Sequence, residues 1–287
     1  MREIAVKVTT LIENRPSATD ARLASEWGLA LHVEVNGRSL LFDTGSSGAF
    51  ADNARRLSVD LSSVEAAVLS HHHYDHGGGL RRFFEVNKRA KVYMGAPPDG
   101  ECVGRLYGFL KKRVGLDAAL VREYPERFEI VTERSEVLPG VHLLPRISGR
   151  HPRPVGNRRL FVEKDGALRP DDFAHEIVAA MEEEGGLVIF SGCSHSGILN
   201  MIETVAAAFP EIPIRAVVGG FHLVTAPPLR LLAGSRRAVE DLARAVLDHP
   251  VGMTYTGHCT GDWAFEILEK TMGGRISDLR TGTCFEA

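Results

Sequence analysis

The sequence lacks the features that mark a membrane-embedded or a nucleic-acid-coating protein. No run approaches the roughly 20 apolar residues of a membrane-spanning helix, and residues 1–7 carry charges where a signal peptide needs an apolar stretch. In its 287 residues, 34 Lys and Arg stand against 37 Asp and Glu, and a net charge of −3 argues against nucleic-acid binding through bulk charge. We therefore expect a cytoplasmic protein without membrane contact or a nucleic-acid partner; the sequence does not determine its oligomeric state.

Cysteine is scarce, and several catalytic motifs are missing. The four cysteines are far apart with no Cys-x-x-Cys pair, which is typical of reduced thiols. Neither a phosphate-binding Gly-x-x-x-x-Gly-Lys-Ser/Thr loop nor a dinucleotide-binding Gly-x-Gly-x-x-Gly is present. His175-Glu176 is followed by Ala179 where a zincin helix requires histidine, and residues 192–196 lack the second glycine of a nucleophile elbow. These absences argue against nucleotide-binding folds, zincins and serine hydrolases.

The composition, 44% hydrophobic and 25% charged, is that of a globular protein, and the length allows one large domain spanning residues 1–287. Apolar runs and turn signals predict strands at 4–12, 29–35, 40–42, 66–69, 92–94, 187–190, 214–218 and 253–255, and helices at 48–57, 80–86, 172–184, 198–209, 235–247 and 263–272. Early strands followed by alternating helices and strands predict a layered α/β protein whose helices cover a sheet sandwich. Residues 97–127 are predicted to form a small insertion packed on the main body.

Histidine is concentrated in one segment. Four of the 12 histidines, His71, His72, His73 and His76, lie within six residues. Residues two apart in an extended chain point to the same side, so His71 and His73 are expected to bind one ion. Asp75 and His76 lie beyond a bend and can face a second position. Nitrogen and oxygen ligands of this kind suit zinc, iron or manganese.

This segment, His-His-His-Tyr-Asp-His at 71–76 preceded by Leu-Phe-Asp-Thr-Gly at 41–45, resembles the metallo-β-lactamase superfamily. Gly-Cys-Ser-His-Ser-Gly at 192–197, Gly-Gly-Phe-His-Leu at 219–223 and Gly-His-Cys-Thr-Gly at 257–261 are similar to the dihydropterin-ribofuranosyl-aminobenzene-phosphate synthase-like branch. The resemblance extends over nearly the whole chain. It implies an αββα sandwich with two metal sites along one edge of the sheets, and a hydrolase as the usual activity.

The resemblance also assigns ligands. His71 and His73 match the first-metal histidines, Asp75 and His76 match second-metal ligands, and His258 matches the last metal histidine. Asp75 is also the expected acceptor for a proton of the attacking water.

The chain departs from the superfamily pattern at Gly192, which precedes Cys193, whereas many relatives have an aspartate there that bridges the metals. We expect His195 to supply the missing nitrogen ligand, with Cys193 as the lesser alternative. The chain must turn into the helix at 198, with Ser194 or Ser196 as its N-cap. Only one of the two side chains is therefore expected to reach an ion.

Further residues have supporting roles in this interpretation. Asp43 is expected to orient a metal ligand and the active-site loop. His222, at the end of a predicted strand, is expected to contact the substrate or a metal, with a packing role as the alternative. Arg150 and Arg153 lie in the arginine-rich loop 146–159 and are expected to bind an anionic substrate, because guanidinium pairs with phosphate; a solvated loop is the alternative.

The expected function is metal-dependent hydrolysis of a small phosphorylated substrate, a phosphoester or phosphodiester, through a metal-activated water. The expected cofactors are two divalent transition-metal ions, zinc first and iron or manganese as alternatives. A transferase joining a pterin diphosphate to an arylamine ribofuranosyl phosphate is the second hypothesis. An iron-dependent redox enzyme using the same ligands is the third, and it differs because zinc has no redox chemistry.

Overall fold

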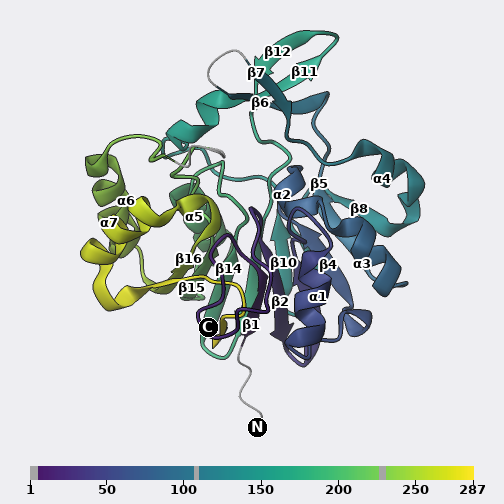
Figure 1. Cartoon of the computed structure of the whole chain (residues 1–287). Helices are drawn as coiled ribbons and strands as arrows, with labels where there is room; N and C mark the ends of the chain where they lie inside the picture. Colours follow the sequence, from purple (N-terminus) through teal and green to yellow (C-terminus); the bar gives the residue numbers. More distant parts are fainter. Residues whose placement is uncertain (1–5, 107–109, 226–230) are drawn as a thin grey trace.

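The computed structural model describes residues 6–106, 110–225 and 231–287. Two seven-stranded sheets form its centre, and helices cover both outer faces (Figure 1). The first sheet has the order β18 (Cys284–Glu286), β1 (Lys7–Ile12), β2 (Ala30–Val35), β3 (Arg38–Phe42), β4 (Ala66–Leu69), β5 (Lys91–Gly95) and β8 (Phe128–Val131). The second has the order β17 (Ile276–Asp278), β16 (Val251–Thr256), β15 (Ile214–Gly219), β14 (Gly186–Phe190), β13 (Val178–Glu183), β10 (Val141–Leu144) and β9 (Ser135–Leu138). This architecture confirms the predicted αββα sandwich.

The helices divide between the two sheets. On the first sheet lie α1 (Ala49–Arg56), α3 (Leu80–Val86) and α4 (Ala118–Glu123), and on the second lie α5 (Ile198–Ala208), α6 (Arg236–Asp248) and α7 (Asp262–Met272) (Figure 1). The remaining helical turns are α2 (Tyr74–Gly77), η1 (Leu61–Ser63), η2 (Pro125–Arg127), η3 (Val155–Arg159), η4 (His258–Thr260) and η5 (Gly273–Arg275). None of the helices in the described ranges combines the length and the apolarity needed to cross a bilayer.

Three layers of buried apolar side chains hold the sandwich together. The central layer lies between the sheets and includes Phe42 and Phe190, whose ring centroids are 5.8 Å apart. One outer layer lies beneath α1, α3 and α4, and the other beneath α5, α6 and α7. Burial of these faces, at about 25 cal/mol per Å² of apolar surface, is the main force that fixes the layers.

Strand direction places the loops that matter for function. Strands β3, β4, β5 and β8 run parallel to one another, and so do β14, β15, β16 and β17. The carboxyl ends of parallel strands meet at one edge of a sheet, where α/β proteins bind ligands. The segments beginning at Asp43, Ser70, Ser191, Gly220 and Gly257 all follow such ends.

A smaller sheet lies over one end of the sandwich, with the order β12 (Ala167–Pro170), β11 (Leu160–Lys164), β6 (Glu101–Leu106) and β7 (Leu110–Arg113) (Figure 1). We call it the cap sheet. The predicted insertion 97–127 therefore divides: β6 pairs with β7 and with the later strand β11 in the cap sheet, while α4 packs Leu120 against the apolar layer beneath the helices of the first sheet.

The prediction of a helix at 172–184 is wrong. Residues 178–183 form β13, which pairs with β10 on one side and β14 on the other. The segment contains Ala, Met and Glu, which have high intrinsic helix propensity. Here the run from Val178 to Met181 is fully buried as a central strand, so burial between two sheets and ladder hydrogen bonds override propensity.

Candidate metal centre

The loops at the carboxyl edge adopt strained backbone conformations. Asp43, Ser194, His222 and His258 all have positive φ, at 59°, 56°, 49° and 50°. Residues other than glycine rarely adopt this region, and such strain concentrates at functional sites. Position 192 requires glycine because Ser70 lies so close that a Cβ there would be 2.1 Å from the Ser70 hydroxyl oxygen.

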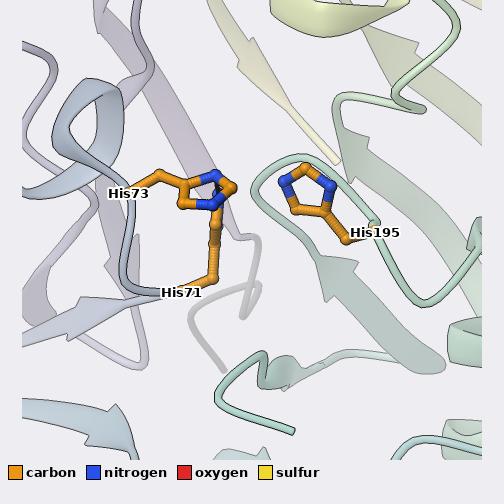
Figure 2. A group of neighbouring side chains, drawn as sticks. All are labelled: His71, His73 and His195. Carbon is orange, nitrogen blue, oxygen red and sulfur yellow. Dashed lines mark hydrogen bonds between the residues drawn. The ribbon is translucent and has the colours of Figure 1, made fainter. Parts of the chain in front are cut away.

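A first group of ligand atoms comes from His71, His73 and His195. These side chains are buried, and their ligand nitrogens lie within 4.8 Å of one another. His71 Nε2 and His73 Nδ1 are 3.1 Å apart. Figure 2 shows the His195 ring facing the other two from the opposite loop. Two chain segments more than 120 residues apart therefore converge on one point.

A second group lies beside the first. His76 Nε2 is 3.1 Å from His258 Nε2 and 3.2 Å from Cys193 Sγ, and Asp75 Oδ2 is 3.5 Å from His258 Nε2. The ring centroids of His71 and His76 are 4.2 Å apart, so the two groups adjoin.

Each imidazole has one ring nitrogen that faces the cluster and one that faces away, which we call the inner and the outer nitrogen. In four of these rings the outer nitrogen donates a hydrogen bond to an oxygen. His71 Nδ1 donates to Ser70 Oγ at 2.9 Å, and His76 Nδ1 donates to Asp43 Oδ2 at 2.6 Å. An asparagine holds each of the other two rings through both ends of its amide: Asn157 Oδ1 accepts from His195 Nδ1 and Asn14 Oδ1 from His258 Nδ1, while each Nδ2 donates to the carbonyl of the same histidine. The hydrogen on the outer nitrogen leaves the inner lone pair directed at the cluster.

This geometry fits metal ions. Two metal–nitrogen bonds of about 2.05 Å meeting near the tetrahedral angle place their nitrogens about 3.3 Å apart. The separations between His71 and His73 and between His76 and His258 are both 3.1 Å. Within the described ranges His195 Nε2 is a buried atom with no hydrogen-bond partner, as expected for a nitrogen that needs a cation.

The electrostatics differ between the two groups. Burial holds the pKa of His71 and His195 well below the ordinary value and lowers the pKa of His73 to about 3, so the first group is neutral at pH 7. Burial also disfavours the charged form of His76, but the carboxylates of Asp43 and Asp75 outweigh it and raise its pKa to about 9. The carboxylates of Asp43 and Asp75 therefore favour a positive charge at the second group, which a bound cation can supply in place of the His76 proton.

Two buried carboxylates hold the loops that carry the ligands. Glu176 accepts from the backbone N–H of His195 at 2.7 Å and of Ser196 at 2.6 Å. Glu13 accepts from the backbone N–H groups of Arg15 and His258. Each fixes the backbone beside one histidine of the cluster, so ligand position depends on residues distant in sequence.

The structure brings both Cys193 and His195 to the cluster, although the turn into the helix at 198 was expected to let only one of the two side chains reach an ion. Both side chains belong to a group whose ligand atoms lie within 4.8 Å of one another. The positive φ of Ser194 bends the chain between them, and neither Ser194 nor Ser196 caps the helix, which begins after Gly197 instead. Burial raises the pKa of the Cys193 thiol well above its ordinary value.

The substrate-binding candidates occupy different places. His222 lies at the cluster, its ring centroid 4.2 Å from that of His195. Loop 146–159 also reaches it, because Asn157 holds His195 and a Cβ on Gly156 would lie 2.8 Å from the His222 ring. Both arginines are exposed, and Arg150 lies 4.0 Å from Glu203 of α5.

Sequence reasoning missed the residues that support the ligands: Glu13, Asn14, Asn157 and Glu176. In the sequence, Asn14 and Asn157 resemble ordinary turn residues. Only His175-Glu176 attracted notice, as a failed zincin motif. No local signal identifies the others, since each contacts its partner through tertiary structure.

Comparisons with known proteins agree with this geometry. A sequence profile of the metallo-beta-lactamase superfamily matches residues 29–193. The chain is 28% identical to 7,8-dihydropterin-6-methyl-4-(beta-D-ribofuranosyl)-aminobenzene-5'-phosphate synthase of Methanocaldococcus jannaschii. This match extends over 274 residues, which are 89% of this chain and 88% of that protein. A solved metal-dependent hydrolase of the beta-lactamase superfamily has a TM-score of 0.79 at 28% identity, over 98% of this chain and 99% of that one. A diphosphatase of the PhnP family shares the fold, with a TM-score of 0.55 at 14% identity over 98% of each chain.

Proposed function

Because the chain belongs to the metallo-beta-lactamase superfamily, we propose that it is a metal-dependent hydrolase that cleaves a phosphoester or phosphodiester bond in a small anionic substrate. The observation that carries this proposal is the convergence of five imidazoles, a carboxylate and a thiol at the carboxyl edge of the two sheets. The outer nitrogens of four rings are held by oxygens, so the lone pairs are oriented before any ion binds.

In this proposal His71, His73 and His195 hold one ion, and Asp75, His76 and His258 hold the other. Zinc is the first choice for this donor set, with iron or manganese as alternatives. Bound ions of this kind lower the pKa of a coordinated water and stabilise charge on attacking and leaving oxygens.

The chain's own groups have separate roles. The carboxylate of Asp75 accepts the proton of the attacking water. Asp43 keeps the His76 ring oriented through the 2.6 Å hydrogen bond. His222, which is partly exposed beside His195, contacts the substrate, and Arg150 and Arg153 contribute positive charge at the outer face of the loop.

The similarity to the Methanocaldococcus jannaschii synthase favours a second candidate function. A transferase would join a pterin diphosphate to an arylamine ribofuranosyl phosphate and release diphosphate. The same ligands would serve it, because both reactions place negative charge on a phosphate oxygen.

Purified protein loaded with zinc, manganese or iron tests the metal part of the proposal. We expect up to two ions per chain, and His73→Ala or His76→Ala should lower that content. His142→Ala is the matched control, because His142 pairs with Glu182 away from the cluster. Trace occupancy of the wild type after reconstitution, or unaltered content in both variants, contradicts the site assignment. Activity supported by iron alone, with an oxidised product, would favour the redox hypothesis.

Substrate assays test the reaction. We expect the loaded enzyme to release nitrophenol from bis(4-nitrophenyl) phosphate or 4-nitrophenyl phosphate, and His258→Ala to abolish this activity. Consumption of a pterin diphosphate only when an arylamine is present, with neither ester hydrolysed, would replace the hydrolase by the transferase.

A further inference from the structure

Among the histidines proposed as metal ligands, His73 differs in the hydrogen bonding of its outer nitrogen. The outer nitrogens of His71, His76, His195 and His258 all donate to an oxygen. His73 directs Nδ1 toward His71, and within the described part of the chain its Nε2 is a buried atom with no hydrogen-bond partner. A histidine that binds metal through Nδ1 carries its hydrogen on Nε2, so that hydrogen needs an acceptor.

A buried carboxylate close to this ring belongs to Asp171. An imidazole nitrogen of His73, the Cys102 sulfur and a carboxylate oxygen of Asp171 lie within 4.8 Å of one another, and all three side chains are buried. One bridging water spans a separation of this size. The Cys102 thiol is a weaker acceptor than a carboxylate.

Asp171 is firmly held in this position. Its Oδ1 accepts from the backbone N–H of Phe173 at 2.8 Å, and its Oδ2 accepts from His175 Nε2 at 3.2 Å. His175 Nδ1 in turn accepts from the backbone N–H of His72 at 3.2 Å. This chain of hydrogen bonds ties Asp171, which follows β12 of the cap sheet, to the residue beside His73.

We infer that Asp171 is a positioning residue for His73: it accepts the Nε2 hydrogen, directly or through one water, and so directs the Nδ1 lone pair to the first metal ion. The cap sheet thereby supports the metal centre through Asp171. This inference rests on the proposed function, because it needs His73 to be a metal ligand.

Asp171→Asn tests the inference with little change of shape. The amide oxygen still accepts from Phe173, while the amide nitrogen replaces the acceptor that faces His175 and Cys102. We expect the dissociation constant of the first ion to rise about 10–100-fold, the usual effect of losing an outer partner. The Nε2 proton of His73 in zinc-loaded, histidine-labelled protein should exchange faster with solvent. Asp172→Asn is the matched control, since Asp172 is exposed and, among the residues that the structure describes, accepts only from the Ala174 N–H.

The outcomes are separable. A first-ion dissociation constant within two-fold of wild type in Asp171→Asn overturns the inference, and so does an equal loss of affinity in Cys102→Ala. A third bound ion that Asp171→Asn removes would show that His73, Cys102 and Asp171 form a metal site instead.

Denaturant unfolding of the metal-free variants identifies a folding defect, in which case Asp171→Glu, which keeps the carboxylate, should restore affinity. If wild type itself binds no metal, the proposed function fails; if wild type binds and Asp171→Asn binds equally, only this inference fails.

Discussion

Replacing Asp43 by asparagine should weaken both the fold and the second metal position. The Asp43 side chain is fully buried. Its Oδ1 accepts from Ser70 N at 2.8 Å, and its Oδ2 accepts from Ser70 Oγ at 2.8 Å and from His76 Nδ1 at 2.6 Å. Asparagine keeps the first bond but turns an NH₂ group toward the two donors that faced Oδ2.

The magnitude follows from these contacts. Two hydrogen bonds to a charged acceptor are lost, at about 1.5–3 kcal/mol each, so the free energy of unfolding should fall by about 3–6 kcal/mol. At roughly 2–4 °C per kcal/mol for chains of this size, Tm should fall by at least about 6 °C. Because the His76 ring loses its outer partner, affinity for the second ion should fall about 10–100-fold, with less change at the first.

Denaturant unfolding of the metal-free protein measures the first effect, and chelator competition measures the second. Asp60→Asn is the control, because Asp60 caps η1 from an exposed position and asparagine caps a helix equally well. Unchanged stability together with second-ion affinity within two-fold of wild type would refute the reasoning about Asp43.

Three further predictions concern the same site. His195→Ala should abolish activity and first-ion retention, whereas Cys193→Ser should keep both ions; a thiolate-to-cobalt charge-transfer band lost in Cys193→Ser would identify the cysteine as a ligand. Arg153→Ala should raise KM for a phosphorylated substrate about ten-fold, the loss of one charge-assisted hydrogen bond, and Arg150→Ala should raise it less, since Glu203 lies 4.0 Å from Arg150; unchanged kinetic constants in both would leave the loop without a binding role. With a pKa of about 9, metal-free His76 is protonated at pH 7 and must lose its proton to bind metal. Second-ion affinity should therefore rise about ten-fold per pH unit from 6 to 8 and level off above about 9; a flat profile with no proton release contradicts this.

The elements predicted correctly have strong local patterns. Helices α5, α6 and α7 begin and end within a few residues of the predicted ranges, because each presents one apolar face at helical spacing. Asn36 and Gly37 both have positive φ in the turn between β2 and β3, as the Asn-Gly signal predicts. Where local propensity and tertiary environment disagreed, as in β13, the prediction was wrong.

The candidate ligands were found in sequence for a similar reason. His71, His73, Asp75 and His76 lie within six residues, so their spacing alone places them in one loop. The supporting residues show the opposite case. Asn14 and His258 are separated by 244 residues, and Asn157 and His195 by 38, yet each pair forms a two-point contact. An asparagine in a turn carries no local sign of such a partner.

The sequence by itself therefore determined the layered α/β class and the candidate ligands at 71–76, because periodicity and short-range spacing encode them. The assignment of His195 and His258 came from the family resemblance. Only the tertiary structure decided that Cys193 and His195 both reach the cluster and which nitrogen of each ring faces inward. It also decided that Asp43 and Asp75 keep His76 charged while burial keeps the first group neutral. The physical reason is that ring orientation and protonation depend on hydrogen bonds and burial supplied by segments far apart in the chain.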